Sequence, residues 1–180
     1  MNKPDRRVER TRLALLQAFI DLVLSEGYEA TTVDAVAARA NIGRSTFYVH
    51  FRSKEDILKH SMGYPNRELA RALDTETTAE QLVPLLEHFH SQRRINRVFF
   101  EPPVRTIWIR HLASLLEPKL SQRRSSAPLL PVPLVALQVA ELQVGLAAKW
   151  LSGRHLLKPV VVAEAMLAAV RATVAALLPD

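Results

Sequence analysis

The chain has 180 residues, of which 48% are hydrophobic and 23% are charged, the balance of an ordinary globular protein. It contains no cysteine, which excludes disulfides and cysteine metal sites and fits a reducing cytoplasm. The formal net charge of +6 permits a polyanionic partner such as nucleic acid. Residues 1–60 carry ten Lys and Arg against eight Asp and Glu, so charge alone does not locate a contact surface.

The opening residues are charged and contain no apolar segment of the kind found in a secretory signal. Later apolar stretches are interrupted by Glu, Lys, Arg or Pro before they reach the ~20 residues that a membrane span needs. We therefore expect a soluble, cytoplasmic protein without a membrane partner.

Helical periodicity dominates the N-terminal third of the chain. Between Asp5 and Glu26, apolar residues recur at three- and four-residue steps, and Gly27 supplies a helix stop. A second helix is predicted to begin at Thr31, which can cap it, with Asp34 three residues on completing a capping-box-like pattern.

A turn and two further short helices follow. Asn41 tolerates the left-handed conformation that a tight turn needs, and Gly43 is an acceptable cap. The next helix is predicted from Arg44 to about Phe51, and Ser53 caps another. Helices of these proportions indicate a helix-turn-helix unit, in which one short helix fits the major groove of DNA.

Longer and more apolar helices are predicted beyond residue 60. They include a helix through 78–89 and others over 104–116, 134–152 and 159–178, with a proline-rich linker at 121–133. No stretch alternates in the manner of a strand. The sequence therefore predicts an all-α fold, with a DNA-binding domain over residues 1–60 and a helical regulatory domain over 61–180.

Polar side chains crowd the helix that begins at Arg44. Those able to hydrogen-bond base edges or phosphates are Arg44, Ser45, Thr46, Tyr48 and His50. Phe47 and Phe51 are four residues apart and are predicted to anchor the helix in the core. On periodicity alone, the segment could equally be an ordinary surface helix with a hydrophobic anchor.

A more specific signal is one ungapped block of residues between positions 13 and 58. Its members are Gly27-Tyr28, Thr31-Thr32-Val33, Val36-Ala37, Ala40, Thr46-Phe47-Tyr48, His50-Phe51, Ser53-Lys54-Glu55 and Leu58. In order and spacing, this block resembles the DNA-binding domain of the TetR family of bacterial regulators. The chain departs from the family pattern at Asn41, Gly43 and Val49, where a glycine, a serine and often a tyrosine are usual.

The resemblance implies roles for individual residues. Thr32 would contact a phosphate, while Arg44, Ser45 and Thr46 would lie in the groove. Tyr48 and His50 would hold the DNA backbone, and Lys54 would reach a phosphate, assisted by its helix N-terminus.

The resemblance also implies a homodimer that binds a near-palindromic operator as a repressor and is released by a small-molecule inducer. The last two helices are similar to the dimerising pair of the family. Their candidate interface residues are Ala140, Gly145, Ala148, Met166, Val170 and Leu177. Both helices could equally be core helices of a monomer.

An effector pocket is expected among the helices of residues 79–120. Its candidate residues are His88, Phe89, Phe99, Arg105, Trp108 and His111, although aromatics at helical spacing are more often core. The arginines of this region hint at an anionic ligand: Arg93, Arg94, Arg97, Arg105 and Arg110. His88 and His90 point to nearly opposite sides of a helix, so we expect no metal, and no cofactor is predicted.

The sequence contains no phosphate-binding loop, dinucleotide glycine motif or nucleophile elbow, so we do not expect an enzyme. Two non-enzymatic functions besides ligand-controlled regulation are compatible with the sequence. One is that of an architectural DNA-binding protein without a small-molecule ligand, which would bind with a steep dependence on salt and little on sequence. The second is that of a helical adaptor that binds proteins and keeps a vestigial DNA reader.

Overall fold

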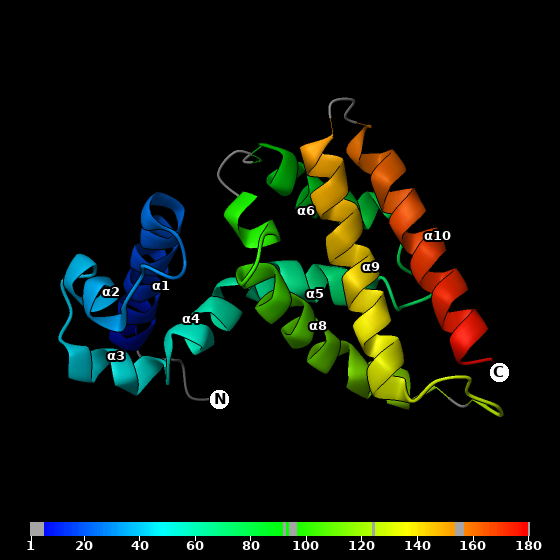
Figure 1. Ribbon diagram of the computed structural model, residues 1–180, viewed down its shortest axis with the longest axis horizontal. Coiled ribbons are helices and arrows are strands. Elements are labelled where there is room, and N and C mark those ends of the chain that lie inside the picture. The colour runs from blue at the N-terminus through cyan, green and yellow to red at the C-terminus, as the bar shows by residue number, and fades with distance from the viewer. Residues whose placement is uncertain (1–5, 92, 94–96, 124, 154–156, 180) are drawn as a thin grey trace. The chain divides into compact units, whose positions relative to one another are not determined.

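The computed structural model describes residues 6–91, 93, 97–123, 125–153 and 157–179. Regular structure in these residues is entirely helical, which confirms the predicted fold class (Figure 1). The chain divides into two compact units, Met1–Gly63 and Tyr64–Asp180, and each is described by itself.

The N-terminal unit contains four helices, α1 (Arg6–Glu26), α2 (Val33–Arg39), α3 (Arg44–His50) and α4 (Lys54–Ser61). Helix α1 ends where predicted, because Gly27 adopts a φ of 85° that other residues rarely accept. Asn41 has a φ of 54° and makes the turn between α2 and α3, also as predicted. The predicted first residue of α1, Asp5, lies outside the described residues.

The predicted start of α2 was wrong by one residue. Thr32, not Thr31, is the N-cap, and its Oγ1 accepts a hydrogen bond of 3.1 Å from the Ala35 backbone N–H. Thr31 is fully buried, and its hydroxyl donates instead to the Gly27 carbonyl at 2.8 Å. Asp34 does not close a capping box and pairs with a side chain of α3.

Aromatic and aliphatic side chains from all four helices fill the core of the N-terminal unit. Its fully buried members include Leu15, Phe19, Val23, Val36, Phe47, Phe51, Ile57 and Leu58. The rings of Phe47 and Phe51 lie 5.8 Å apart between centroids. Helix α3 is therefore anchored at both of its predicted phenylalanines.

The C-terminal unit holds α5 (Gly63–Arg71), whose first residue belongs to the N-terminal unit, and α6 (Ala79–Ser91). The 3-10 helix η1 (Arg97–Phe100) follows, and then α8 (Val104–Ser121), α9 (Val132–Ser152) and α10 (Pro159–Leu177). Helix α5 was not predicted. Pro65 lies in the first turn of α5, where a backbone N–H would have no helical partner, so proline is tolerated there. The only interruption between α4 and α5 is at Met62.

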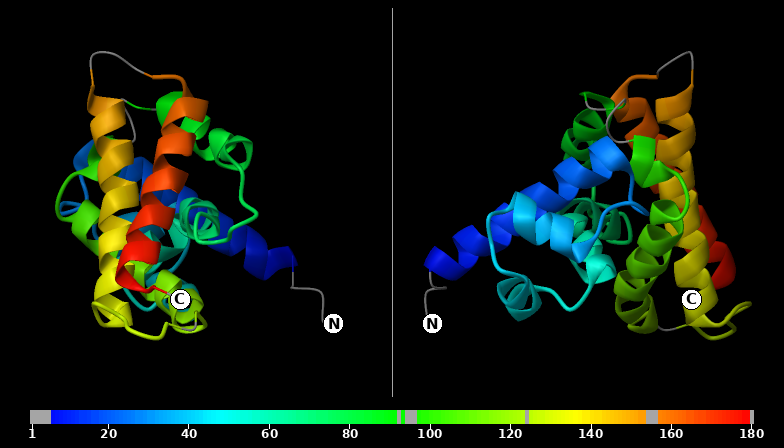
Figure 2. Two further views of the ribbon diagram at one scale, coloured as in Figure 1. Left: turned by 90° about the vertical axis from the view of Figure 1, so that its right-hand side faces the viewer. Right: turned by 60° about the vertical axis from the view of Figure 1, so that its left-hand side comes forward.

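Polar contacts tie α5 to the helices around it. The Trp108 indole N–H donates to Asn66 Oδ1 at 2.7 Å, and Gln143 Nε2 donates to the Leu69 carbonyl at 2.8 Å. Helix α8 packs on α9, and α10 packs on α6 and α9, as Figure 2 shows for the neighbouring α9 and α10. The C-terminal unit is thus a packed helical bundle.

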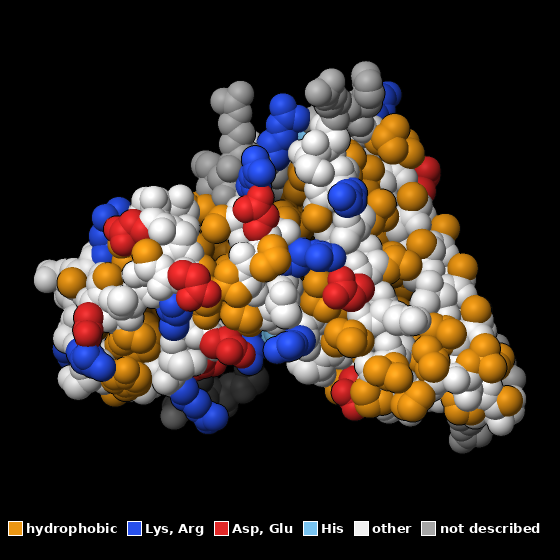
Figure 3. Space-filling model, viewed as in Figure 1, with side chains coloured by type: hydrophobic (Ala, Val, Ile, Leu, Met, Phe, Trp, Pro, Cys, Tyr) orange, Lys and Arg blue, Asp and Glu red, His pale blue; other side chains and the backbone are white. Residues whose placement is uncertain are grey.

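Helices α9 and α10 are the most apolar of the long helices. They have 21 and 19 residues, and by length and composition alone each could cross a membrane. Only 44% and 33% of their most apolar windows are buried within the chain. Hydrophobic side chains accordingly run along the exposed face of α10 (Figure 3). Each helix also carries one acidic and one basic residue, Glu141 and Lys149 on α9 and Glu164 and Arg171 on α10.

Candidate nucleic-acid interface

Helix α3 separates its side chains into a buried face and an exposed face. Phe47 has no exposed surface, whereas Arg44, Ser45, Tyr48 and Val49 are exposed. Val49 is 80% exposed, the largest value for any large hydrophobic side chain among the described residues. Two of the three residues predicted for the groove, Arg44 and Ser45, therefore stand on the outward face of a helix whose inner face is buried.

Arg44 is held at the start of this face by an ion pair with α2. Its NH1 lies 2.8 Å from both carboxylate oxygens of Asp34, and its guanidinium carbon lies 5.9 Å from the centroid of the Tyr48 ring. The Tyr48 side chain first, and the Asp34 carboxylate second, hold the pKa of Arg44 above its ordinary value. Arg44 stays cationic, and a DNA phosphate or base would compete with Asp34 for it.

The other predicted contact residues occupy mixed positions. Thr32 is exposed, but its hydroxyl oxygen already caps α2. Thr46 and His50 are half-buried at the edge of α3, and the His50 ring lies 6.4 Å from that of Phe51. Arg44, Ser45 and Tyr48 are thus the predicted residues that the structure brings together on one open face.

Lys54 does not stand free at the first turn of α4. Its Nζ donates to the Tyr28 carbonyl at 2.9 Å and to the Glu29 carbonyl at 3.4 Å, and it lies 4.3 Å from the centroid of the Tyr28 ring. Burial, followed by the nearby Glu55 and Glu29, raises the pKa of Tyr28, so its ring stays a neutral platform for this cation. Lys54 therefore ties the turn after α1 to the start of α4.

Sequence reasoning missed three residues around this face. Asp34 was expected to act in a cap and instead neutralises Arg44. Arg52 lies beside the N-terminus of α4 and is exposed, while its backbone N–H donates to Asp56 Oδ2 at 2.8 Å. Val49 was noted only as a departure from the family pattern, although its position two residues from both Phe47 and Phe51 places it on the side of the helix opposite these anchors.

The effector candidates in the C-terminal unit do not lie around one cavity. Phe89 and Trp108 are buried in an aromatic core with Phe100, at centroid distances of 6.0 Å from each other and of 5.4 and 5.2 Å from Phe100. Arg105 lines a cavity of about 590 Å³, which Phe100 lines in place of the neighbouring Phe99. The residues that line this cavity do not include His88 or His111, and Arg94 lies outside the described residues.

The dimer candidates lie mostly on inward faces. Ala140, Met166 and Val170 have no exposed surface within the single chain, so in this conformation they have none to offer a second one. Gly145 and Ala148 line the cavity beside Arg105, and Leu177 is half-buried at the end of α10. In this conformation, Leu177 is the candidate outside the core and the cavity lining that keeps surface for an interface.

The N-terminal unit is a helix-turn-helix domain in which α3 is the presented helix, and comparison with known proteins identifies its family. Residues 15–60 match the sequence profile described as bacterial regulatory proteins, tetR family. A crystal structure of a TetR transcriptional regulator from Streptococcus agalactiae 2603V is 26% identical, with a TM-score of 0.59, and the alignment covers 92% of this chain and 96% of that one. Residues 15–60 therefore form a DNA-binding domain of the TetR family type.

Two curated relatives show how far the similarity extends. An uncharacterized HTH-type transcriptional regulator, YxbF from Bacillus subtilis (strain 168), is 38% identical over 76 residues, or 42% of this chain and only 19% of the relative. The HTH-type transcriptional repressor BepR from Brucella suis biovar 1 (strain 1330) is 28% identical over 160 residues, or 83% of this chain and 75% of the relative. The YxbF match therefore concerns a minor part of that protein, whereas the BepR match extends into the C-terminal unit.

Proposed function

We propose that this protein is a DNA-binding transcriptional regulator that binds a near-palindromic operator as a homodimer and represses transcription until a small molecule binds its C-terminal unit. The observation that carries the proposal is the outward face of α3, where Arg44, Ser45 and Tyr48 stand exposed on a helix fixed by two fully buried phenylalanines. A short helix with this division can enter the major groove and present its N-terminal half to base edges.

The residues of this face differ in the information they would read. Arg44 can donate to guanine or to a phosphate, and Ser45 can bond either a base or a phosphate. Val49 offers two methyl groups, which suit the methyl group of thymine rather than a hydrogen-bonding base edge. Thr46 is proposed to lie in the groove with Arg44 and Ser45, while Thr32, Tyr48 and His50 are proposed to contact the DNA backbone.

We propose Arg52, in place of Lys54, as the residue that contacts a phosphate beside α4. Two carbonyl oxygens and the Tyr28 ring already hold the Lys54 ammonium, so a contact with DNA would require leaving all three. Arg52 is exposed one residue before the Ser53 cap, where the N-terminus of α4 also favours an anion. Lys54 is proposed to position the helix that carries this contact.

The homodimer is proposed to form through α10. Its exposed residues Val161, Ala165, Ala168, Ala172 and Ala175 recur at steps of four and three, and we call them the α10 stripe. Small apolar residues at this spacing let two helices approach closely along a narrow seam. Pairing with a second copy would cover the apolar surface that the single chain leaves open, while the charged Glu164 and Arg171 beside the stripe disfavour lipid.

Selection of bound sequences from a random pool of duplex DNA tests the proposed function. We expect the full chain to enrich a near-palindrome with half-site centres about 10–10.5 base pairs apart. Enrichment of single, non-palindromic half-sites would contradict the dimeric mode. Failure to enrich any sequence would contradict the regulator itself.

The Asp34–Arg44 pair gives a specific prediction. The Asp34→Asn substitution removes a carboxylate that repels phosphate and competes for Arg44, so we expect operator affinity to rise by roughly threefold to tenfold at low salt. Both side chains are more than 60% exposed, and the free energy of unfolding should change by less than about 1 kcal/mol. Fluorescence anisotropy with labelled operator measures the affinity.

The matched control is Glu26→Gln, which removes an exposed carboxylate at the end of α1 rather than beside Arg44. It changes the net charge by the same amount, and we expect a smaller gain in affinity. An equal gain in both variants would mean that only net charge matters, and weaker binding by Asp34→Asn would show that the ion pair orients Arg44 for DNA.

A further inference from the structure

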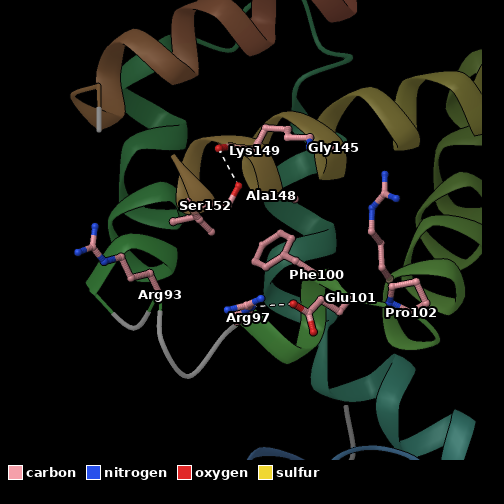
Figure 4. Close-up of a pocket in the computed structure, with 11 residues that line it drawn as sticks. Arg93, Arg97, Phe100, Glu101, Pro102, Gly145, Ala148, Lys149 and Ser152 are labelled. Atoms are coloured by element: carbon pink, nitrogen blue, oxygen red, sulfur yellow. Dashed lines mark hydrogen bonds and ion pairs between the residues drawn. The ribbon is translucent and has the colours of Figure 1, made fainter. Parts of the chain in front are cut away.

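The cavity of about 590 Å³ in the C-terminal unit is lined by Arg93 after α6, by η1 and the two residues that follow it, by the start of α8 and by the C-terminal half of α9. Small-molecule sites have volumes of roughly 300–1,000 Å³, so its size suits a ligand of moderate mass. Figure 4 shows the lining residues, with the Phe100 ring on one side and Ala148 and Ser152 of α9 on another.

Positive charge dominates the lining. Four cationic side chains reach the cavity, Arg93, Arg97, Arg105 and Lys149, and the lining contains one carboxylate, that of Glu101. Glu101 already lies 2.7 Å from Arg97, and Arg105 pairs at 2.9 Å with Glu141 of α9. Within the described parts of the chain, no carboxylate lies within ion-pair distance of Arg93 or Lys149. Two of the four cations therefore remain uncompensated.

Arg105 adds a second, independent observation. Its Nε is buried and has no hydrogen-bond acceptor among the described residues, a state that costs about 1–3 kcal/mol. Gly145 lies against the same side chain, since a Cβ at this position would stand 3.6 Å from Arg105 NH2. Arg105 and Gly145 therefore meet on one wall of the cavity.

The rest of the lining is apolar. Phe100, Pro102, Ala148 and Leu151 supply carbon surface next to the cations. An inorganic anion would leave this apolar surface exposed to water, whereas an organic anion with an aromatic or short aliphatic body would bury it. Charge and apolar surface together define one class of ligand.

We propose that this cavity binds an amphipathic organic anion, whose carboxylate or sulfonate is bound by cationic side chains of the lining and whose apolar body lies against Phe100 and Leu151. All residues of the proposed binding site belong to the C-terminal unit. Its use as the effector site rests on the proposed function.

The test compares two probes of nearly equal shape on the full chain, 2-naphthoate and the neutral 2-naphthamide, by isothermal titration calorimetry. We expect the carboxylate to bind at least about tenfold more tightly than the amide. The Arg93→Gln and Lys149→Gln substitutions should each weaken naphthoate binding several-fold, and they should leave naphthamide binding nearly unchanged. Both side chains are exposed, so neither variant should impair folding.

Arg110→Gln is the matched control, because Arg110 is an exposed arginine of α8 outside the cavity lining. Equal affinity for the two probes, no binding of either, or equal losses in the Arg110 and Arg93 variants would overturn the proposed site. Operator affinity measured with saturating naphthoate separates the two proposals. Binding that depends on Arg93 and Lys149 supports the anion site whatever the DNA does, whereas an unchanged operator affinity would count against naphthoate as an inducer.

Discussion

Replacing Phe47 with alanine is expected to destabilise the N-terminal unit by about 3–5 kcal/mol, because a fully buried aromatic ring would leave a cavity between α3 and the rest of the core. Both tryptophans, Trp108 and Trp150, belong to the C-terminal unit, so their fluorescence does not report this loss. Hydrogen exchange read by mass spectrometry does. We expect amides of α2 and α3 to exchange on the order of a hundredfold faster or more, and operator binding to weaken accordingly.

Val49→Ala is the control for this experiment, two residues away on the same helix. Val49 is 80% exposed, so its truncation should alter exchange of α3 by less than about threefold. Equal effects of the two substitutions on exchange would show that α3 is not anchored through Phe47. Helix α3 would then not be held in place by its buried phenylalanine.

Replacing Ala168 with arginine is expected to break the proposed dimer. Ala168 lies in the middle of the α10 stripe, where the long side chain of arginine would not fit a close contact between two copies of α10 and its charge would lose solvent. We expect the dimer dissociation constant to rise on the order of a hundredfold or more, with a comparable loss in affinity for a palindromic operator. Sedimentation velocity measures the first effect and fluorescence anisotropy the second.

Gln122→Arg adds the same charge at an exposed position after α8, away from the stripe, and should leave both measurements nearly unchanged. A wild-type chain that sediments as a monomer at micromolar concentration would refute the proposed dimer directly. Dimers of Ala168→Arg as stable as the wild type would instead remove the α10 stripe from the interface.

Residues with special backbone preferences made most of the helix boundaries predictable. Gly27, Asn41 and Pro159 each permit or impose one backbone conformation, and the helices end or begin at them. The choice between Thr31 and Thr32 as the α2 cap could not be made locally, because both can cap. Burial of Thr31 in the folded unit decides it. Helix α5 was missed because Gly63 and Pro65 signal a break, although both are tolerated in a first turn.

The candidate site was predictable as far as its helical face extends. Phe47 and Phe51, four residues apart, determine which way α3 turns, and the exposure of Arg44, Ser45 and Tyr48 follows. The partners of Arg44 and Lys54 lie ten and about 26 residues away in the chain, and no local pattern indicates such pairs. On α9 and α10, nearly every position is apolar, so periodicity could not tell the buried face from the exposed one, and buried residues such as Met166 were proposed for the interface.

The most direct test of the central proposal is protection of guanine N7 from dimethyl sulfate, on a selected operator with guanines in both half-sites. N7 lies in the major groove, where α3 is proposed to bind. We expect the full chain to protect two groups of guanines whose centres are about one helical turn apart, and we expect the Phe47→Ala variant to protect neither. Unprotected guanines under saturating protein, with adenine N3 in the minor groove protected instead, would contradict the placement of α3 in the major groove.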